Sequence, residues 1–248
     1  MYYRFAQAKQ ILQVQGLKFY LNKAKKFYVW SDHNADIKNV IKQYSSDYNI
    51  FVDIGANFGK ITIDSAKYFS KCICFEPSIE NYNKLISNLQ NYEISNVSAF
   101  NCALGKKRGI GKLFLSPNLP GQNRLHMTHN ENWNWQDVEI RTLDDVMEEL
   151  GIYEKCVIKI DAEGSELSIF EGGQKTLQKD CLIISEFNPM CLSINNSEPS
   201  DYVDFLKSLG YSFFDLNGKP TSKKYLNRLC LKGKDKKFVC DDFLIKKI

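Results

Sequence analysis

Short apolar runs that alternate with helical stretches place the strongest constraint on the fold of this chain. The apolar runs span 50–54, 72–75, 97–102, 156–160 and 181–185. The intervening helical patterns span 62–69, 81–89, 143–150 and 167–177. Near-continuous apolar strands separated by helices indicate a parallel sheet that is covered on both faces. The sequence therefore predicts an α/β fold, which a chain of 248 residues can complete as one domain with an appendage.

The segments outside this alternation divide the chain further. Residues 1–48 are predicted to form an N-terminal helical extension, because apolar residues recur every three or four positions between 5 and 28. The main domain is predicted over 49–248, with an insertion at about 110–142 that carries two antiparallel strands and a polar loop. The chain is then expected to finish with a helix at 202–209, a strand at 211–216, a short helix near Tyr225 and a last strand at 238–245.

Composition excludes several classes of function. The net charge of +4 is too small to indicate a nucleic-acid partner. No run of about 18 apolar residues is present, so no membrane span is predicted, and the N-terminus lacks signal-peptide features. The eight cysteines include no C-x-x-C pair, and five of them lie in apolar strands. We therefore expect free thiols, no structural zinc and a reduced, cytoplasmic compartment.

Acidic residues gather at the predicted strand ends. Asp53, Glu76, Asp161 and Glu186 each stand at or near the end of a different strand. In an open parallel sheet, ligands bind in the crevice outside the carboxyl ends of the strands. A single acid there is explained equally well by the capping of a helix, but four together favour a binding site.

The first strand runs into a glycine-rich turn, "VDIGANFGK", that limits the choice of ligand. Gly55 and Gly59 allow a tight turn into a helix and a close approach of backbone to ligand. Glu76 follows the acid of this turn by 23 residues, a distance typical of a carboxylate that accepts hydrogen bonds from ribose hydroxyls. A dinucleotide fingerprint would need glycine in place of Asn57 and Lys60. A ribose ligand without pyrophosphate fits better, and S-adenosylmethionine is such a ligand.

Six segments in a fixed order carry a family resemblance. They are "FVDIGANFGKITIDSA", "CICFEPSIENYNKLISNL", "NVSAFNCALG", "VEIRTLDDVM", "VIKIDAEGSELSIFEGG" and "LIISEFNP". From about Ile50 to Pro189 the chain thus resembles the FkbM-family methyltransferases. The resemblance implies a Rossmann-like class I methyltransferase fold, with a seven-stranded, mostly parallel sheet and an antiparallel last strand. It also implies S-adenosylmethionine as methyl donor and O-methylation of a hydroxyl, often on a sugar or secondary metabolite.

The resemblance further implies the donor-binding residues. The methionine part is expected to lie on the first turn, at Asp53, Gly55, Asn57 and Gly59, and the ribose on Glu76. Pro77 belongs to the same motif, although its position at the start of a helix explains it equally well. Ala103 and Leu104 match the segment that contacts adenine, although their apolar character also suits the core.

The motif "KIDAEGSE" holds the candidate catalytic groups. Methyl transfer is an in-line displacement that gains mostly from alignment, and an alcohol acceptor must also lose its proton. Asp161 is the first candidate for the base, with Glu186 and Glu163 as alternatives, while Glu166 suits a first-turn acid. Lys159 lies in a buried strand, where it contacts either substrate or a neighbouring acid.

The loop "PNLPGQNRLHMTHNENWNWQ" is the candidate acceptor wall. Trp133 and Trp135 offer flat apolar faces, which suit a sugar ring when asparagine amides stand beside them. His126 and His129 are further candidates for the base. A solvated polar loop explains the same residues. The acids at the strand ends can also hold Mg²⁺, but no fixed metal spacing favours it, and no metal site is predicted.

The sequence thus predicts an S-adenosylmethionine-dependent O-methyltransferase that acts on a hydroxyl of a small molecule, with a sugar or glycan precursor as the preferred acceptor. Two alternatives remain at this point, an NAD-dependent oxidoreductase and a non-catalytic binding module with the same fold. The N-terminal helix is expected to cap the site or to mediate a homodimer.

Overall fold

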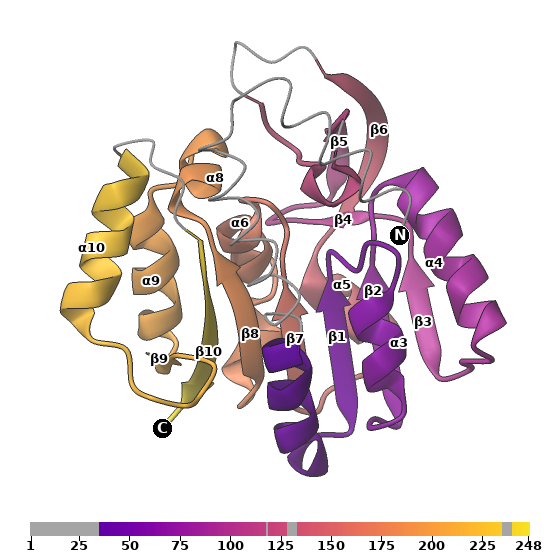
Figure 1. The fold of residues 1–248 in the computed structure, drawn as a ribbon, viewed down its shortest axis with the longest axis horizontal. Helices are drawn as coiled ribbons and strands as arrows, with labels where there is room; N and C mark the ends of the chain where they lie inside the picture. The colour runs from indigo at the N-terminus through magenta and orange to yellow at the C-terminus, as the bar shows by residue number, and fades with distance from the viewer. Residues whose placement is uncertain (1–34, 118, 128–132, 235–239) are drawn as a thin grey trace, which may run out of the picture.

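A seven-stranded sheet forms the centre of the molecule (Figure 1). The computed structural model describes residues 35–117, 119–127, 133–234 and 240–248. The strand order is β3-β2-β1-β7-β8-β10-β9. The strands are β1 (Ile50–Ile54), β2 (Lys71–Phe75), β3 (Val97–Phe100), β7 (Cys156–Ile160), β8 (Leu182–Phe187), β9 (Tyr211–Phe214) and β10 (Asp241–Lys247). Strand β10 runs antiparallel to β8 and β9, and the other pairs are parallel, which confirms the predicted Rossmann-like α/β fold.

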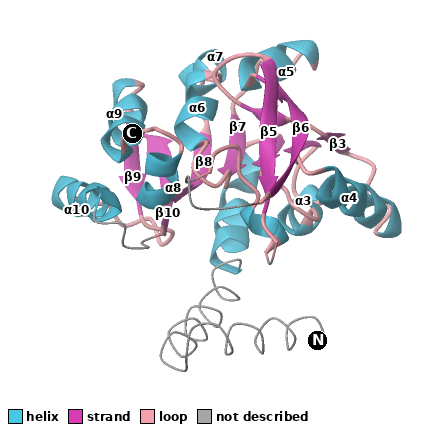
Figure 2. Cartoon of the chain, turned by 90° about the horizontal axis from the view of Figure 1, so that it is seen from above, coloured by secondary structure: helices cyan, strands magenta, loops and turns pink. Residues whose placement is uncertain are grey.

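Helices cover both faces of this sheet (Figure 2). One face carries α5 (Leu143–Glu149), α6 (Glu166–Glu171), α7 (Gln174–Gln178), α9 (Pro199–Ser208) and α10 (Lys223–Lys234). The other face carries α3 (Lys60–Ala66), α4 (Ile79–Asn91) and a helix over 35–44. Strand residues alternate between the two faces, so Ile158 and Ile160 enter the first core and Val157 enters the second. Lys159 shares the face of Val157, so its side chain lies on the opposite face of the sheet from the larger core.

The N-terminal region is described in part. In the helix over 35–44, Ile37, Val40 and Ile41 are buried against the second face of the sheet. Residues 1–34, with the predicted helix at 5–28, lie outside the described residues. The boundaries of the extension and of the main domain therefore stay predictions.

The insertion forms a second, smaller sheet above the carboxyl ends of the main strands (Figure 1). Its strands are β4 (Ala103–Leu104), β5 (Gly109–Leu115) and β6 (Asn134–Arg141), in the order β4-β6-β5. Strands β5 and β6 pair antiparallel, as predicted. The short 3-10 helix η2 (Pro120–Gln122) lies in the loop that joins them. Residues 118 and 128–132 of this loop lie outside the described residues.

Three helices differ from the sequence prediction. The helix expected over 167–177 is two helices, because the pair Gly172–Gly173 stands between them, with Gly172 ending α6 and Gly173 preceding α7. A β-carbon on Gly172 would stand 2.1 Å from the Gly105 carbonyl oxygen. Helix α8 (Pro189–Ile194) is absent from the prediction, although Asn188 caps it and proline occupies its first turn. Helix α10 is 12 residues long, well beyond the short helix expected near Tyr225.

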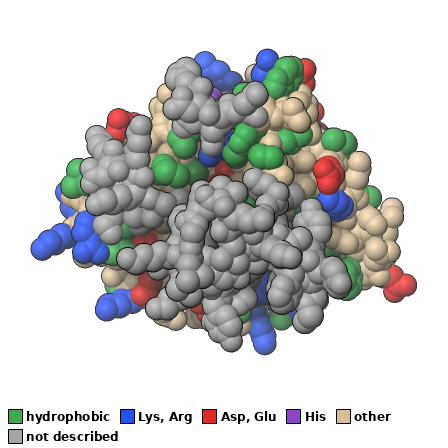
Figure 3. Space-filling model, turned by 45° about the horizontal axis from the view of Figure 1, so that its top comes forward, with side chains coloured by type: hydrophobic (Ala, Val, Ile, Leu, Met, Phe, Trp, Pro, Cys, Tyr) green, Lys and Arg blue, Asp and Glu red, His purple; other side chains and the backbone are tan. Residues whose placement is uncertain are grey.

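The cysteines, the helices and the charged side chains can each be located in the structure. All eight cysteines lie within the described residues as free thiols. Across the described helices, none is both long and apolar enough to cross a membrane. On the face shown in Figure 3, the coloured basic and acidic side chains stand singly or in small groups.

Substitution of Gly55 tests how tightly the turn after β1 packs against the end of β7. Its φ of +78° and a β-carbon that would stand 2.0 Å from the Asp161 carbonyl oxygen both oppose a side chain. We predict that Gly55→Ala lowers the free energy of unfolding by at least about 2 kcal/mol more than Gly151→Ala. Gly151 has a φ of +65° with nothing near its β-carbon, so it reports backbone strain alone. Equal losses in urea denaturation would show that the close approach is absent.

Candidate active site

A buried ion pair joins the ends of β1 and β7. Asp53 and Lys159 are register partners on these strands, and the Asp53 side chain is fully buried. The Lys159 ammonium lies 3.5 Å from Asp53 Oδ1, 3.6 Å from Asp161 Oδ2 and 3.2 Å from the Gly55 carbonyl oxygen, to which it donates. Burial lowers the pKa of Lys159, but the carboxylates of Asp53 and Asp161 outweigh it, and the pKa is raised. Lys159 is therefore a permanent cation whose partners are acids of the site.

The turn after β1 is held in a left-handed conformation. Gly55, Asn57 and Gly59 have φ angles of +78°, +53° and +81°. The hydroxyl of Thr62 donates to Asp53 Oδ2 at 2.6 Å, which ties the start of α3 to the strand. Asn57 Oδ1 is buried and has no hydrogen-bond partner. The turn thus presents an unused acceptor beside the acid of β1.

Glu76 closes the same turn from the end of β2. Its Oε2 accepts the backbone N–H of Asn57 at 2.8 Å, and its Oε1 accepts the backbone N–H of Ser78 at 2.9 Å. Burial raises the pKa of Glu76, although these hydrogen bonds act in the opposite direction. Oε2 keeps a free lone pair for a ligand hydroxyl, because a carboxylate oxygen accepts two hydrogen bonds.

Two side-chain amides hold the backbone beside the segment expected to contact adenine. Asn101 Nδ2 donates to the carbonyl oxygens of Glu76 and Pro77, and Gln136 Nε2 of β6 donates to the same Pro77 oxygen at 3.1 Å. Ala103 and Leu104 follow as buried residues of β4, and Leu104 packs into the main core. Asn101 lies in the motif "NVSAFNCALG" that carries the resemblance, whereas Gln136 was not a sequence candidate, because its contact depends on the small sheet lying over β2.

Four carboxyl groups form the acidic cluster, which we define as Asp161, Glu163, Glu166 and Glu186. Asp161 is the most open, with 42% of its side chain exposed, and Lys159 lies beside it. Glu166 is almost fully buried, and its Oε1 accepts the backbone N–H groups of Ala162 and Gly164 at 2.9 and 3.2 Å. The backbone of Glu163 has a φ of +50°, an unusual value for a residue with a side chain.

Two thiols line this cluster. Cys191 of α8 lies 3.8 Å from Glu163 Oε2, and Cys240 lies 2.5 Å from Glu186 Oε1. Burial, followed by the nearby carboxylates, raises the pKa of both thiols, which therefore stay protonated and donate to the acids. Neither cysteine was a candidate from sequence, because only the fold brings these strand-end and helix positions together.

Burial also sets the protonation of the cluster. Desolvation, followed by the charge of Asp161, raises the pKa of Glu163 to about 8. Desolvation raises the pKa of Glu166 to about 7, and it raises that of Glu186 well above its ordinary value. The cluster therefore holds protons near neutral pH, and it can exchange them with a bound hydroxyl.

The insertion loop reaches over these groups. A β-carbon on Gly121 would lie 3.1 Å from the Asn57 amide nitrogen, so η2 rests on the turn after β1. Arg124 stacks on Trp133 with 4.5 Å between the guanidinium carbon and the ring centroid, and its charge acts on Glu163 to lower the pKa of that carboxyl. Arg124 was not a sequence candidate, because a single arginine in a polar loop carries no pattern.

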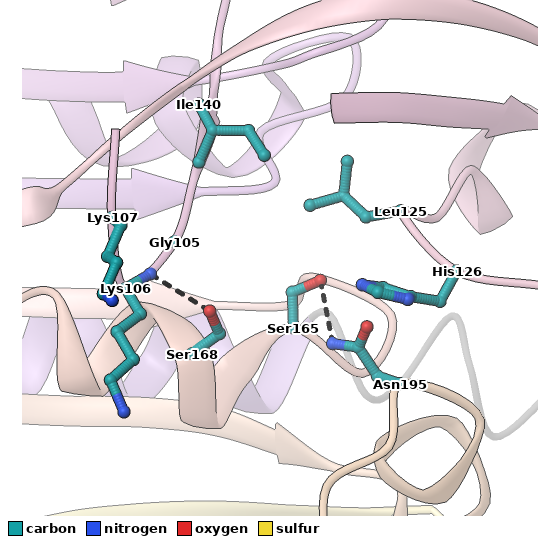
Figure 4. Close-up of a pocket in the computed structure, with 9 residues that line it drawn as sticks. All are labelled: Gly105, Lys106, Lys107, Leu125, His126, Ile140, Ser165, Ser168 and Asn195. Atoms are coloured by element: carbon teal, nitrogen blue, oxygen red, sulfur yellow. Dashed lines mark hydrogen bonds between the residues drawn. The ribbon is translucent and has the colours of Figure 1, made fainter. Parts of the chain in front are cut away.

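The predicted acceptor residues are not all gathered at the cluster. Trp133 stacks on Arg124, whose charge acts on Glu163 of the cluster. Trp135, in contrast, is 48% exposed and packs beneath the Lys112 ammonium. His126 lines a separate pocket (Figure 4). His129 and three of the five asparagines of the loop, at positions 118, 130 and 132, lie outside the described residues. Within the described residues, no group of three or more His, Cys, Asp and Glu side chains is arranged to hold a metal, so the structure gives no support to Mg²⁺.

The fold and the strand-end acids together define a class I methyltransferase-like protein. The family model described as the Methyltransferase FkbM domain matches residues 53–213, which is more than half of the chain. The chain belongs to this family. The match begins at Asp53 and includes every strand-end acid described above.

Individual relatives agree with the family. Methyltransferase sdnD from Sordaria araneosa is 29% identical over 175 residues, which cover 58% of this chain and 66% of that protein. The 2-O-methyltransferase NoeI from Sinorhizobium fredii (strain NBRC 101917 / NGR234) is 24% identical over 160 residues, which cover 56% of this chain and 63% of that protein. The chain thus spans just under two thirds of the length of these relatives. A solved structure of Methyltransferase FkbM from Methylobacillus flagellatus KT has a TM-score of 0.49 and 17% identity, covering 81% of this chain and 44% of that one.

The raised pKa of the buried Glu166 carboxyl makes the free energy of unfolding depend on pH. Its folded pKa of about 7 exceeds the ordinary value of 4.5, so the folded state holds the proton more tightly than the unfolded state. The protonated Glu166 side chain therefore contributes its full stabilisation below pH 4.5. Roughly 3 kcal/mol of this stabilisation is lost as the pH rises to about 7. Glu166→Gln keeps an acceptor for Ala162 and Gly164 but cannot ionise.

We predict that the free energy of unfolding of Glu166→Gln, relative to that of the wild type, increases progressively between pH 5 and pH 8. Urea denaturation at both pH values measures the difference. Glu148→Gln serves as the control, because the Glu148 side chain is 67% exposed. A difference that does not grow with pH would contradict a raised pKa at Glu166.

Proposed function

We propose that this chain transfers the methyl group of S-adenosylmethionine to a hydroxyl oxygen, with a sugar or glycan precursor as the acceptor. The observation that carries the proposal is the hydrogen bond that the Asn57 backbone N–H donates to Glu76 across the turn after β1. The bond lies at the carboxyl edge of the sheet, where Gly55 of the same turn packs against the backbone of Asp161. The family match to a methyltransferase domain supports the same function.

The residues present fit such a donor. Glu76 keeps an acceptor for a ribose hydroxyl, and the buried Asn57 Oδ1 lacks a partner that an ammonium can supply. Asp53 Oδ1 also makes no hydrogen bond, although Lys159 lies 3.5 Å from it. When bound, the donor would supply an electrophilic methyl group on a positively charged sulfur. Carboxylates nearby favour that charge electrostatically.

The acidic cluster suits the acceptor half of the reaction. Forming the new C–O bond releases the hydroxyl proton, which must move to a group within hydrogen-bond reach. Asp161 is the most open of the acids, and the Lys159 ammonium lies 3.6 Å from its Oδ2. We therefore assign Asp161 as the group that accepts the proton, with Glu163 and Glu186 as the alternatives. Their raised pKa values suit groups that pass a proton onward.

Hydroxyl oxygen is the preferred acceptor atom for two reasons. A basic carboxylate is the group needed to remove a hydroxyl proton, and a protein named 2-O-methyltransferase NoeI is among the relatives. The Arg124–Trp133 stack, which borders the acidic cluster, offers a flat and partly apolar wall of the kind that sugar rings pack on. The N-terminal helix as a dimer contact and a cytoplasmic location remain part of the same proposal.

The two alternatives have less support. An NAD-dependent oxidoreductase would need glycines where Asn57 and Lys60 stand, and the Asn57 N–H already binds Glu76. A non-catalytic module would not need a set of carboxyls with raised pKa values at the strand ends.

Calorimetric titration of the purified chain with S-adenosylhomocysteine tests the donor site. We predict micromolar binding that Glu76→Ala weakens at least tenfold, because the ribose hydroxyls lose their acceptor. Glu80→Ala, in the first turn of the helix that follows Glu76, is the control, since the Glu80 side chain is 73% exposed. NAD⁺ is titrated in parallel. Binding of NAD⁺ in place of S-adenosylhomocysteine would favour the oxidoreductase. Binding of neither ligand would favour the non-catalytic module.

Asp161→Asn tests the acceptor half separately. We predict unchanged affinity for S-adenosylhomocysteine and a loss of turnover of 10²-fold or more, because the amide cannot accept the hydroxyl proton. Turnover is measured as transfer of labelled methyl groups to neutral sugars. Asp204→Asn, on the exposed side of α9, is the control. Undiminished turnover in Asp161→Asn would remove Asp161 as the base and leave Glu186 or Glu163.

A further inference from the structure

A side pocket of about 220 Å³ lies next to the acidic cluster (Figure 4). It is lined by Gly105, Lys106, Lys107, Leu125, His126, Ile140, Ser165, Ser168 and Asn195. These residues come from the small sheet, the insertion loop, the start of α6 and the end of α8. None of the carboxyl groups of the acidic cluster lines it, so it is a separate feature of the described residues.

Asn195 gives the side pocket an unused hydrogen-bond acceptor. Its Nδ2 donates to the Gly164 carbonyl oxygen at 2.7 Å and lies 3.4 Å from Ser165 Oγ. This bond to a carbonyl fixes which end of the amide is the nitrogen. Asn195 Oδ1 is therefore the free end, and it is buried with no hydrogen-bond partner. In Figure 4 this oxygen points toward the ring of His126. A buried acceptor without a partner is unfavourable, so a ligand hydroxyl placed there gains a hydrogen bond that the protein lacks.

The rest of the lining suits a neutral, hydroxylated ring. Ser168 Oγ already accepts the Lys106 backbone N–H at 3.0 Å, which leaves its own hydrogen available as a donor. Leu125 and Ile140 supply an apolar wall on the opposite side (Figure 4). The ammonium of Lys106 is paired with Glu171 at 2.9 Å. The combination of hydroxyl, amide and aliphatic groups is typical of sites that bind sugars, whose rings have polar edges and apolar faces.

The side pocket and the acidic cluster share the same supporting segments. On α8, Cys191 contacts Glu163, and Asn195 stands four residues later, one helical turn or about 6 Å along the axis. The turn at 162–165 separates the two, with Glu163 on one side and Ser165 on the other. In the insertion loop, Arg124 acts on Glu163, while the next two residues line the side pocket. A molecule whose hydroxyl lies at the acidic cluster thus has the side pocket within one ring of its reacting group.

We propose that the side pocket is a second acceptor subsite, which holds a non-reacting neutral sugar ring next to the ring that is methylated. This inference rests on the proposed function and adds that the acceptor is larger than one ring. The Asn195 amide would accept a ring hydroxyl, with the His126 ring turning aside, and Leu125 and Ile140 would cover the apolar face of that ring.

NMR of the histidine side chains tests binding without knowledge of the acceptor. The resonance of His126 is assigned by its loss in His126→Ala. The methyl glycosides of glucose, galactose, mannose and xylose are then titrated to roughly 50 mM, with the chain saturated by S-adenosylhomocysteine and also without it. We expect at least one glycoside to shift the His126 resonance with a millimolar dissociation constant. No saturable shift with any of the four would overturn the subsite.

Two variants and one control locate the binding. Asn195→Ala removes the acceptor, and Leu125→Trp enlarges a half-buried side chain of the lining while Asn195 itself is kept. Each should weaken glycoside binding at least fivefold while the melting temperature of Leu125→Trp stays near that of the wild type. Ser193→Ala, on α8 but outside the lining, should bind as the wild type does. Binding that survives both variants would overturn the assignment. A saturable shift in a chain that binds no S-adenosylhomocysteine would refute the proposed function and leave a sugar-binding pocket.

Discussion

The buried contact between Asp53 and Lys159 organises the carboxyl edge of this protein. Two opposite charges that are buried together are stable only when their geometry is good, and removing one partner typically costs about 3–5 kcal/mol. The alternation of strand residues places both side chains on the same face, and the register of β1 with β7 sets them opposite each other. The Gly55 carbonyl oxygen and the Thr62 hydroxyl then bind the same pair. The first turn, the start of α3 and the end of β7 are thereby fixed as one unit.

This unit sets the electrostatics of its surroundings. Lys159 is a cation held between Asp53 and Asp161, whereas burial raises the pKa values of Glu163, Glu166 and Glu186. A fixed positive charge beside carboxyl groups with raised pKa values is an arrangement that a reaction releasing a proton would use. The insertion adds Arg124, whose charge lowers the pKa of Glu163 from the opposite side. Protonation and loop position are therefore linked.

The sequence predicted the features that depend on local pattern and missed those that depend on long-range contact. Apolar periodicity located the strands within a few residues, and the acids at their ends were visible because strand ends meet at one edge. The close approach of Gly172 to Gly105 escaped prediction, because the two residues lie far apart in the sequence. The contacts of Gln136 and Arg124 escaped for the same reason, since each reaches from the insertion to the carboxyl edge of the main sheet. The separation of Trp135 from Trp133 also follows from the fold, because β6 directs Trp135 toward Lys112.

The donor site can be tested by a crystal structure of the chain with S-adenosylhomocysteine. We expect the ribose hydroxyls to bind Glu76, the amino group of the ligand to lie near Asp53 and Asn57, and the sulfur to face Asp161. The Asp53–Lys159 contact should persist in the complex. A ligand bound elsewhere, or a ribose that makes no hydrogen bond to Glu76, would disprove the donor site at this turn.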